Sequence, residues 1–131
     1  MKKLFFFFLI VAGVALLLVR NVQNGKFDAF LDTHGTKAVN SNIQFYMASA
    51  CELLHKNDSA KLRFKKVFEK YPDVPLAPLA MAEYISIASV QGGQIAEVYA
   101  ICRGFMEKYP NHPKAVLIKR RMEILDTLKD I

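Results

Sequence analysis

Few residues in this sequence stand at the spacings on which catalysis or metal binding usually depends. The three histidines, His34, His55 and His112, lie in different segments, and none is at metal-ligand spacing from another histidine or from a cysteine. The chain also lacks a Ser/His/Asp set, a paired-carboxylate motif, a phosphate-binding loop and a dinucleotide fingerprint. We therefore expect no enzyme activity, no cofactor, no metal and no small-molecule substrate, and we expect His55 and His112 to have surface or capping roles.

Cysteine is scarce as well, and its two copies do not form a disulfide framework. Cys51 and Cys102 fall on or beside the apolar stripes of two separate predicted helices. Cysteines in such positions usually behave as small buried apolar residues, and a disulfide would require their Cα atoms to lie within about 7 Å. We expect both to be buried free thiols.

No stretch of the chain alternates apolar and polar residues as a strand would. From Ser41 onward apolar residues recur at helical spacing instead, and Ser41 with Gln44 three residues later matches a capping box. The first apolar stripe contains Ile43, Tyr46, Met47, Ala50, Leu53 and Leu54. Turn residues then predict five helices, over roughly residues 41–57, 58–71, 73–91, 94–109 and 111–131.

One short phrase occurs twice, as EKYPDVP at residues 69–75 and as EKYPNHP at residues 107–113. Proline ends a helix because it lacks an N–H and clashes with the preceding turn, whereas Asp or Asn accepts hydrogen bonds from the free amides of the next helix. We interpret both copies as helix-to-helix turns. In each, the first proline stops one helix, and the residue after it, Asp73 or Asn111, caps the next.

A shift of thirty-eight residues aligns the two halves of this helical region. The matching positions are Tyr46 with Tyr84, Ala50 with Ala88, Glu69 with Glu107, Lys70 with Lys108, Pro75 with Pro113 and Leu79 with Leu117. Within each half, a small residue, an aromatic four later and a proline eight after that resemble the second helix of a tetratricopeptide repeat. Ala60, Phe64 and Pro72 match this spacing, and Val98, Cys102 and Pro110 match it more loosely.

The resemblance covers roughly residues 41–112, although the family's early aromatic and glycine are absent from both copies. It looks most like the divergent repeats of bacterial envelope proteins. It implies a TPR-like solenoid of antiparallel helix pairs, two repeats long, with a C-terminal capping helix. Together with the N-terminal apolar run described below, which we expect to form a transmembrane helix, this gives an all-α chain. A plain antiparallel helical bundle is the alternative.

The resemblance also implies a partner-binding face, because in the family the inner face of each unit's first helix grips peptides. The corresponding residues here are Asn42, Phe45, Ser49, Glu52, Glu83, Ile87 and Gln91. Phe45 and Ser49 stand where chaperone-tail binders carry Lys and Asn, so we expect no terminal carboxylate to be bound in that way. Phe45, Leu62 and Ile87 lie off the main stripes, and we expect them to leave apolar surface for another chain.

A long apolar run dominates the N-terminus. Lys2 and Lys3 precede an uninterrupted apolar stretch over residues 4–19, which Arg20 closes. As a helix this stretch spans about 24 Å, and snorkelling of the flanking cations extends it toward the roughly 30 Å of a bilayer core. The run fits an uncleaved anchor or a signal peptide. We favour the anchor, because no good pair of small residues for cleavage follows the run.

The apolar run also bears on packing and orientation in the membrane. Its small residues, Ala12, Gly13 and Ala15, would let a neighbouring membrane helix approach closely. Two lysines before the run favour a cytoplasmic N-terminus. In a bacterium we therefore expect a single-pass inner-membrane protein whose C-terminal domain lies in the periplasm. We divide the chain into residues 1–24, an anchor or signal sequence, residues 25–40, a linker with one helical turn near residues 27–31, and residues 41–131, the helical domain.

Charge adds little to this picture. The net charge is +6, and because Lys2, Lys3 and Arg20 supply half of it, the remainder carries an ordinary surface balance. We interpret the basic residues between 61 and 70, and those at 119–121, as solvated faces, and we expect no nucleic-acid partner.

We expect a noncatalytic, membrane-tethered scaffold that binds other proteins of a membrane or envelope complex. Two alternatives remain open at this point: a structural accessory subunit held by its membrane helix, and a soluble periplasmic adaptor released after signal cleavage.

Overall fold

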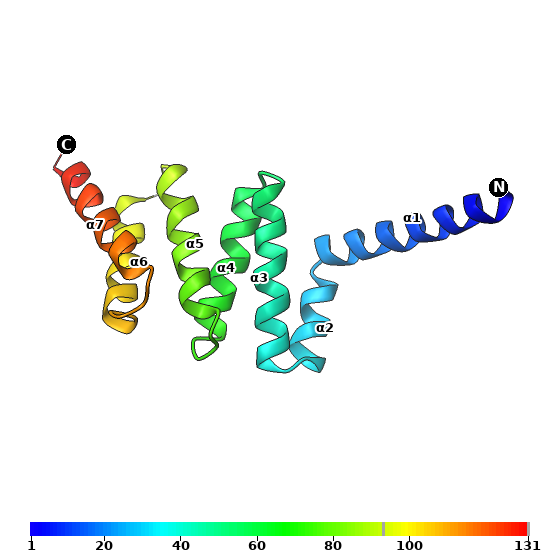
Figure 1. The fold of residues 1–131 in the computed structure, drawn as a ribbon, viewed down its shortest axis with the longest axis horizontal. Helices are drawn as coiled ribbons and strands as arrows, with labels where there is room; N and C mark the ends of the chain where they lie inside the picture. Colours follow the sequence, from blue (N-terminus) through cyan, green and yellow to red (C-terminus); the bar gives the residue numbers. More distant parts are fainter. Residues whose placement is uncertain (93, 131) are drawn as a thin grey trace. The chain divides into compact units, whose positions relative to one another are not determined.

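The computed structural model describes residues 1–92 and 94–130, and these residues form helices joined by short turns, with no strand among them (Figure 1). The helices are α1 (Lys2–Gln23), α2 (Lys26–His34), α3 (Lys37–Leu53), α4 (Asn57–Lys70), α5 (Ala77–Val90), α6 (Ile95–Lys108) and α7 (Ala115–Lys129). The all-α prediction is therefore confirmed. The chain divides into two compact units, Met1–Thr36 and Lys37–Ile131, which we describe separately.

The first unit consists of α1 and α2, which contact each other. Among the described helices, α1 is the one long and apolar enough to cross a membrane, and each of its residues is at least partly exposed. Gly25 makes the turn into α2 with a φ of 71°, a left-handed conformation that costs glycine little because it has no Cβ.

The region interpreted as a linker, residues 25–40, contains α2 and the start of α3. The single turn expected near residues 27–31 is part of a nine-residue helix whose Phe27 is partly buried and whose Leu31 is buried. These two side chains are four residues apart and share one helical face. A helix this short shows its period only once, so the pattern in the sequence is faint.

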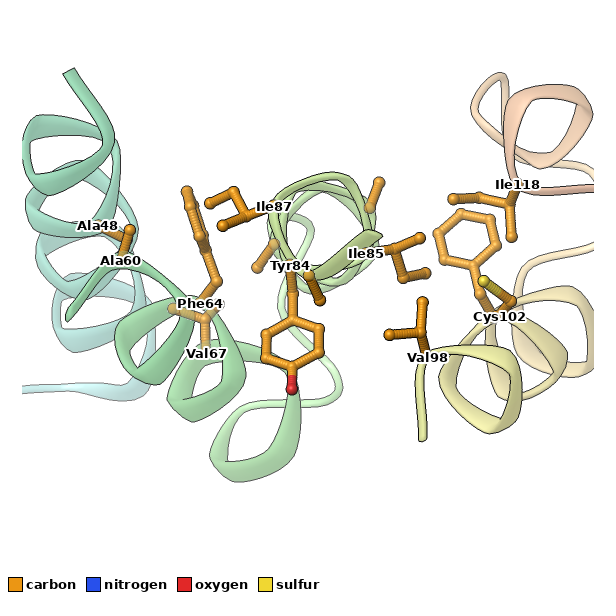
Figure 2. Packing of buried hydrophobic residues seen from close by; sticks show 14 of the residues in the cluster. Ala48, Ala60, Phe64, Val67, Tyr84, Ile85, Ile87, Val98, Cys102 and Ile118 are labelled. Atoms are coloured by element: carbon orange, nitrogen blue, oxygen red, sulfur yellow. The ribbon is translucent and has the colours of Figure 1, made fainter. Parts of the chain in front are cut away.

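In the second unit, helices α3 to α7 lie side by side in chain order, and each packs against the next (Figure 1). One hydrophobic cluster runs through all five helices. Its largest fully buried apolar side chains are Phe64, Phe105, Ile85 and Ile118. Helix α5 is packed on two sides, because Ile87 points toward Phe64 of α4 while Ile85 points toward Val98 of α6 (Figure 2).

The start of α3 corrects the sequence analysis. The helix begins at Lys37, so Ser41 lies within it and donates a hydrogen bond from Oγ to the carbonyl of Ala38 at 3.0 Å. The predicted capping box at Ser41 and Gln44 is therefore wrong. Gly35, extended with φ −94° and ψ 154°, breaks the chain between α2 and α3 instead.

The apolar stripe predicted for α3 is also not its buried face. Tyr46, Ala50, Leu53 and Leu54 are exposed, whereas the buried residues of the helix are Asn40, Ser41, Gln44 and Ala48. Gln44 is fully buried next to α4 because its Oε1 accepts a hydrogen bond from Nη1 of Arg63 at 2.7 Å. A paired amide of this kind is tolerated in a core, which a hydropathy pattern does not reveal.

The repeated phrase forms the same turn twice, as the sequence predicts. After α4, the amides of Tyr71, Val74 and Ala77 donate to the carbonyls of Val67, Tyr71 and Val74. After α6, the amides of Tyr109, His112 and Ala115 donate to the carbonyls of Phe105, Tyr109 and His112. These donors and acceptors correspond one to one under the thirty-eight-residue shift. The two turns therefore share one backbone geometry.

The caps predicted for the following helices are wrong in position. Helix α5 begins at Ala77 and α7 at Ala115, so Asp73 and Asn111 lie within the turns. In the second turn His112 has the capping role, since its Nδ1 accepts a hydrogen bond from the amide of Lys114 at 3.1 Å. Asp58, the first residue of the second predicted helix, lies in the first turn of α4, where its negative charge favours the helix N-terminus.

Candidate interaction surface

The residues predicted to bind a partner come from α3 and α5, the first helix of each predicted pair. On α3, Asn42 is exposed and Phe45, Ser49 and Glu52 are partly buried. On α5, Glu83 is partly buried, and Gln91 is exposed just after the last residue of the helix. The assignment of these residues to a partner stays a prediction, but their positions can be described.

The two helices bring one pair of these residues close together. Burial, and then the charge of the nearby Glu83, raise the pKa of the Glu52 carboxyl above its ordinary value. Carboxylates that share a poorly solvated site repel each other, so a proton is held more firmly. Glu52 of α3 and Glu83 of α5 are therefore like charges that interact on the predicted face.

Two members of the predicted face belong to the core. Ile87 is buried in the cluster between α4 and α5, and the ring of Phe45 lies edge-on to that of Phe64 with the centroids 5.4 Å apart. The expectation that both leave apolar surface for another chain is wrong for Ile87 and weakened for Phe45. Of the three residues named for that role, Leu62 is exposed, on α4.

A polar cluster that the sequence analysis missed joins α4, α5 and α6. The hydroxyl of Tyr84 donates to Oε1 of Glu97 at 3.1 Å, and Nζ of Lys65 lies 3.7 Å from the same oxygen. Burial, then the hydrogen bond to Glu97 and the charge on it, raise the pKa of Tyr84. The three residues are 13 to 32 positions apart in the chain, so no local motif indicates them.

The basic residues of α4 have partners within the domain. Lys61 lies 3.4 Å from Asp58, Lys65 lies 3.9 Å from Glu69, and Arg63 binds Gln44 of α3. Arg63 therefore connects two helices and is not part of a solvated face.

The cysteines and the possible metal ligands form no bonded or clustered site in the described residues. Neither cysteine of the described chain forms a disulfide, and Cys102 is buried while Cys51 is partly buried. Burial raises the pKa of the Cys102 thiol to about 11. Among the described residues, no group of three His, Cys, Asp or Glu side chains is placed to hold a metal ion.

The small residues of α1 lie on a helix surface that is open over the described residues. A Cβ added at Gly13 would meet no atom of them within 4 Å. Helix α1 therefore has room for a close neighbouring helix at Gly13, and Ala12 and Ala15 lie on either side of Gly13 in the sequence. Their role in helix packing stays a prediction.

No protein-family model matches the chain, and no curated protein matches it at a significant level. Over residues 1–92 and 94–130, the fold is all-helical, with one helix long and apolar enough to span a membrane.

Proposed function

We propose that this chain is a noncatalytic, membrane-tethered helical-repeat module of the TPR-like class that binds other proteins of a membrane or envelope assembly. The observation that carries the proposal is the separation of the chain into an apolar helix of membrane-spanning length and a second compact helical unit with its own core. An exposed apolar helix is stable in lipid and not in water, whereas the second unit buries apolar side chains in a core of its own.

The repeat character rests on the two equivalent turns and on the packing of each helix against the next. Helix pairs of this kind bury their apolar faces by stacking on neighbours, as solenoid repeats do. In a bacterium, the two N-terminal lysines favour an inner-membrane protein with its second unit in the periplasm. The partner would meet the face that contains Glu52 and Glu83.

Membrane attachment is tested by fractionating cells that express the full chain. The full chain should sediment with membranes and resist extraction by high salt and alkaline carbonate, whereas a variant without residues 2–23 should be released. N-terminal sequencing of the mature protein distinguishes the soluble alternative, because a start beyond Arg20 would remove the anchor and overturn the tether.

Partner binding is tested by purifying the tagged full chain in a mild detergent and identifying the proteins that accompany it. Charge reversal by Glu83→Lys should remove those proteins, while Glu123→Lys, at an exposed position on α7, should retain them. Circular dichroism of each variant checks that it remains helical. An identical set of proteins from both folded variants would contradict a partner site on α3 and α5.

The alternative, an accessory subunit held by its membrane helix, predicts that co-purification depends on α1 and not on Glu83. If α1 holds the chain in a complex through close packing, Gly13→Leu should abolish co-purification and Glu83→Lys should not. Leu17→Ala, within the same helix, is the matched control because it leaves the small residues in place.

A further inference from the structure

Helix α3 presents an exposed apolar face whose residues are spaced seven apart. Val39 is 49 % exposed, Tyr46 is 66 % exposed and Leu53 is 82 % exposed. Ala50, one helical turn after Tyr46, is exposed as well. We refer to Val39, Tyr46, Ala50 and Leu53 as the α3 stripe. It lies opposite the buried residues Gln44 and Ala48.

The corresponding residues of α5 show what such a face packs against. The thirty-eight-residue shift places Tyr84 at the position of Tyr46 and Ala88 at that of Ala50. Tyr84 is 7 % exposed and Ala88 is 4 % exposed, and the ring of Tyr84 lies edge-on to that of Phe68 on α4. The tyrosine ring at this position is therefore packed against the preceding helix in α5 but exposed in α3. The α3 stripe has the composition of a surface that receives a helix.

The spacing of the α3 stripe also favours a helix as its occupant. Residues that recur every seven positions stay on one side of a helix pair, which is the pattern of coiled-coil packing. An extended peptide or a lipid surface sets no such period. A helix that packs here would contact Val39, Tyr46 and Leu53 over about 21 Å of length.

Charge identifies the occupant. Residues 38–51 contain no Asp, Glu, Lys or Arg, so two α3 helices can approach each other without repulsion between like charges. The other exposed apolar face of this unit, formed by Leu117, Ile124 and Leu128 on α7, carries Arg120 and Arg121 beside it, and two copies of that face would repel. The neutral α3 stripe is therefore the face suited to a second copy of itself.

The order of residues along the α3 stripe is self-complementary in an antiparallel pair. With Tyr46 at a two-fold axis, Val39 of one copy lies opposite Leu53 of the other, and the two tyrosine rings meet at the centre. A two-fold interface requires this relation, in which each residue contacts the same partner position in both directions.

We infer that two copies of this chain associate through their α3 helices, packed antiparallel about a two-fold axis at Tyr46. One helix face buries less than the roughly 800 Å² per partner of a standard interface, so the dimer is weak in dilute solution. Confinement of both copies to one membrane would raise their effective concentration. The α3 geometry does not depend on the proposed function.

Cross-linking of the full chain in intact cells tests the inference. In a Cys51→Ala background, Tyr46→Cys places one thiol at the axis, where a short, membrane-permeant bismaleimide should join two copies. Leu62→Cys, at an exposed apolar position on α4, is the matched control and should give at least five-fold less dimer. Reaction with a monofunctional maleimide should be similar for both variants, which confirms that both thiols are accessible.

The antiparallel arrangement makes a second, independent prediction. Copies carrying Val39→Cys and Leu53→Cys, with different tags, should cross-link to each other when co-expressed. Each alone should give little dimer, since equivalent residues in the two copies would be about 21 Å apart along the helix. Tyr46→Glu, added to both the Val39→Cys and the Leu53→Cys copies, should abolish their cross-link. Tyr46→Glu in one copy and Tyr46→Lys in the other should restore it.

Three results would overturn the inference. One is a dimer yield for Tyr46→Cys no higher than for Leu62→Cys when both thiols are equally accessible. Another is cross-linking of Tyr46→Cys to a different protein alone, which would identify that protein as the occupant of the α3 stripe. The third is efficient self-linking of Val39→Cys and of Leu53→Cys, which would show parallel packing.

Discussion

The ring of Tyr84 on α5 lies edge-on to the ring of Phe68 on α4, with centroids 5.7 Å apart, and the hydroxyl of Tyr84 reaches Glu97 on α6. One side chain thus joins three consecutive helices. Such a residue contributes both packing and a hydrogen bond to a carboxylate, and the two contributions can be separated by mutation.

Tyr84→Phe should lower the free energy of unfolding by about 0.5–1.5 kcal/mol, because it removes the hydrogen bond to Glu97 and keeps the ring against Phe68. Denaturant unfolding followed by circular dichroism measures the change. Tyr46→Phe, at the exposed equivalent position on α3, should change it by less than about 0.5 kcal/mol. Equal effects of the two substitutions would show that the Tyr84 hydrogen bond adds nothing.

Phe64→Ala or Phe105→Ala should destabilise the second unit by about 3–5 kcal/mol, since each removes a fully buried aromatic ring from the shared cluster. A loss of this size is a large part of the stability of a small domain. Leu62→Ala, on the exposed side of α4, should cost less than about 0.5 kcal/mol. A thermal unfolding series orders the three variants, and a loss of less than 1 kcal/mol for both phenylalanines would contradict the described core.

Glu52→Gln should stabilise the second unit at neutral pH. The pKa of Glu52 is raised in the folded chain, so the folded state binds a proton more firmly than the unfolded state does. Its contribution to stability is therefore most favourable below the unfolded pKa of about 4.3 and is lost as the pH rises through the higher folded value. Unfolding measured across pH 3 to 8 should show a gain for Glu52→Gln at the upper end and no gain at the lower end.

Glu83→Gln tests the interaction between Glu52 and Glu83 from the other side, because it removes the charge that helps to raise the pKa of Glu52. It should shift the midpoint of the Glu52 contribution to lower pH. Glu123→Gln, on the exposed surface of α7, is the control and should leave the pH profile unchanged. A pH profile that neither Glu52→Gln nor Glu83→Gln alters would argue against an interaction between the two carboxylates.

Cys102 should react with alkylating agents only when the second unit opens. Its thiol is buried and has a pKa of about 11, so at pH 7 roughly one molecule in 10⁴ carries the reactive thiolate. In a Cys51→Ala variant, mass spectrometry should detect little labelling of the native chain and complete labelling in denaturant. Rapid labelling of the native chain would show that Cys102 is accessible.

Helical periodicity predicted the helices that keep one polar, exposed face. Apolar residues recur at helical spacing in α4 and α6, and Phe64, Val67, Val98 and Phe105 of these helices lie in the core. Each of these helices has a polar face that alternates with its apolar face, so the spacing of apolar residues carries the information.

The same reasoning failed where a helix is buried on most of its circumference or buries polar groups. Helix α5 lies between α4 and α6 and is buried on most of its circumference, so Ile87, placed off the stripe by its spacing, is in the core. Helix α3 buries Ser41 and Gln44 and exposes Tyr46 and Leu53. Hydrogen bonds satisfy both polar groups: Gln44 accepts from Arg63, which only the fold brings close, and Ser41 donates to the carbonyl of Ala38 in the same helix.

The two proline turns are interchangeable connectors. Their backbone bonds correspond one to one, so the chain passes from one helix to the next through the same set of hydrogen bonds in both places. A protein engineer could therefore insert one more copy of the turn sequence, followed by one more helix, to lengthen the helix array of the second unit without redesigning the existing turns.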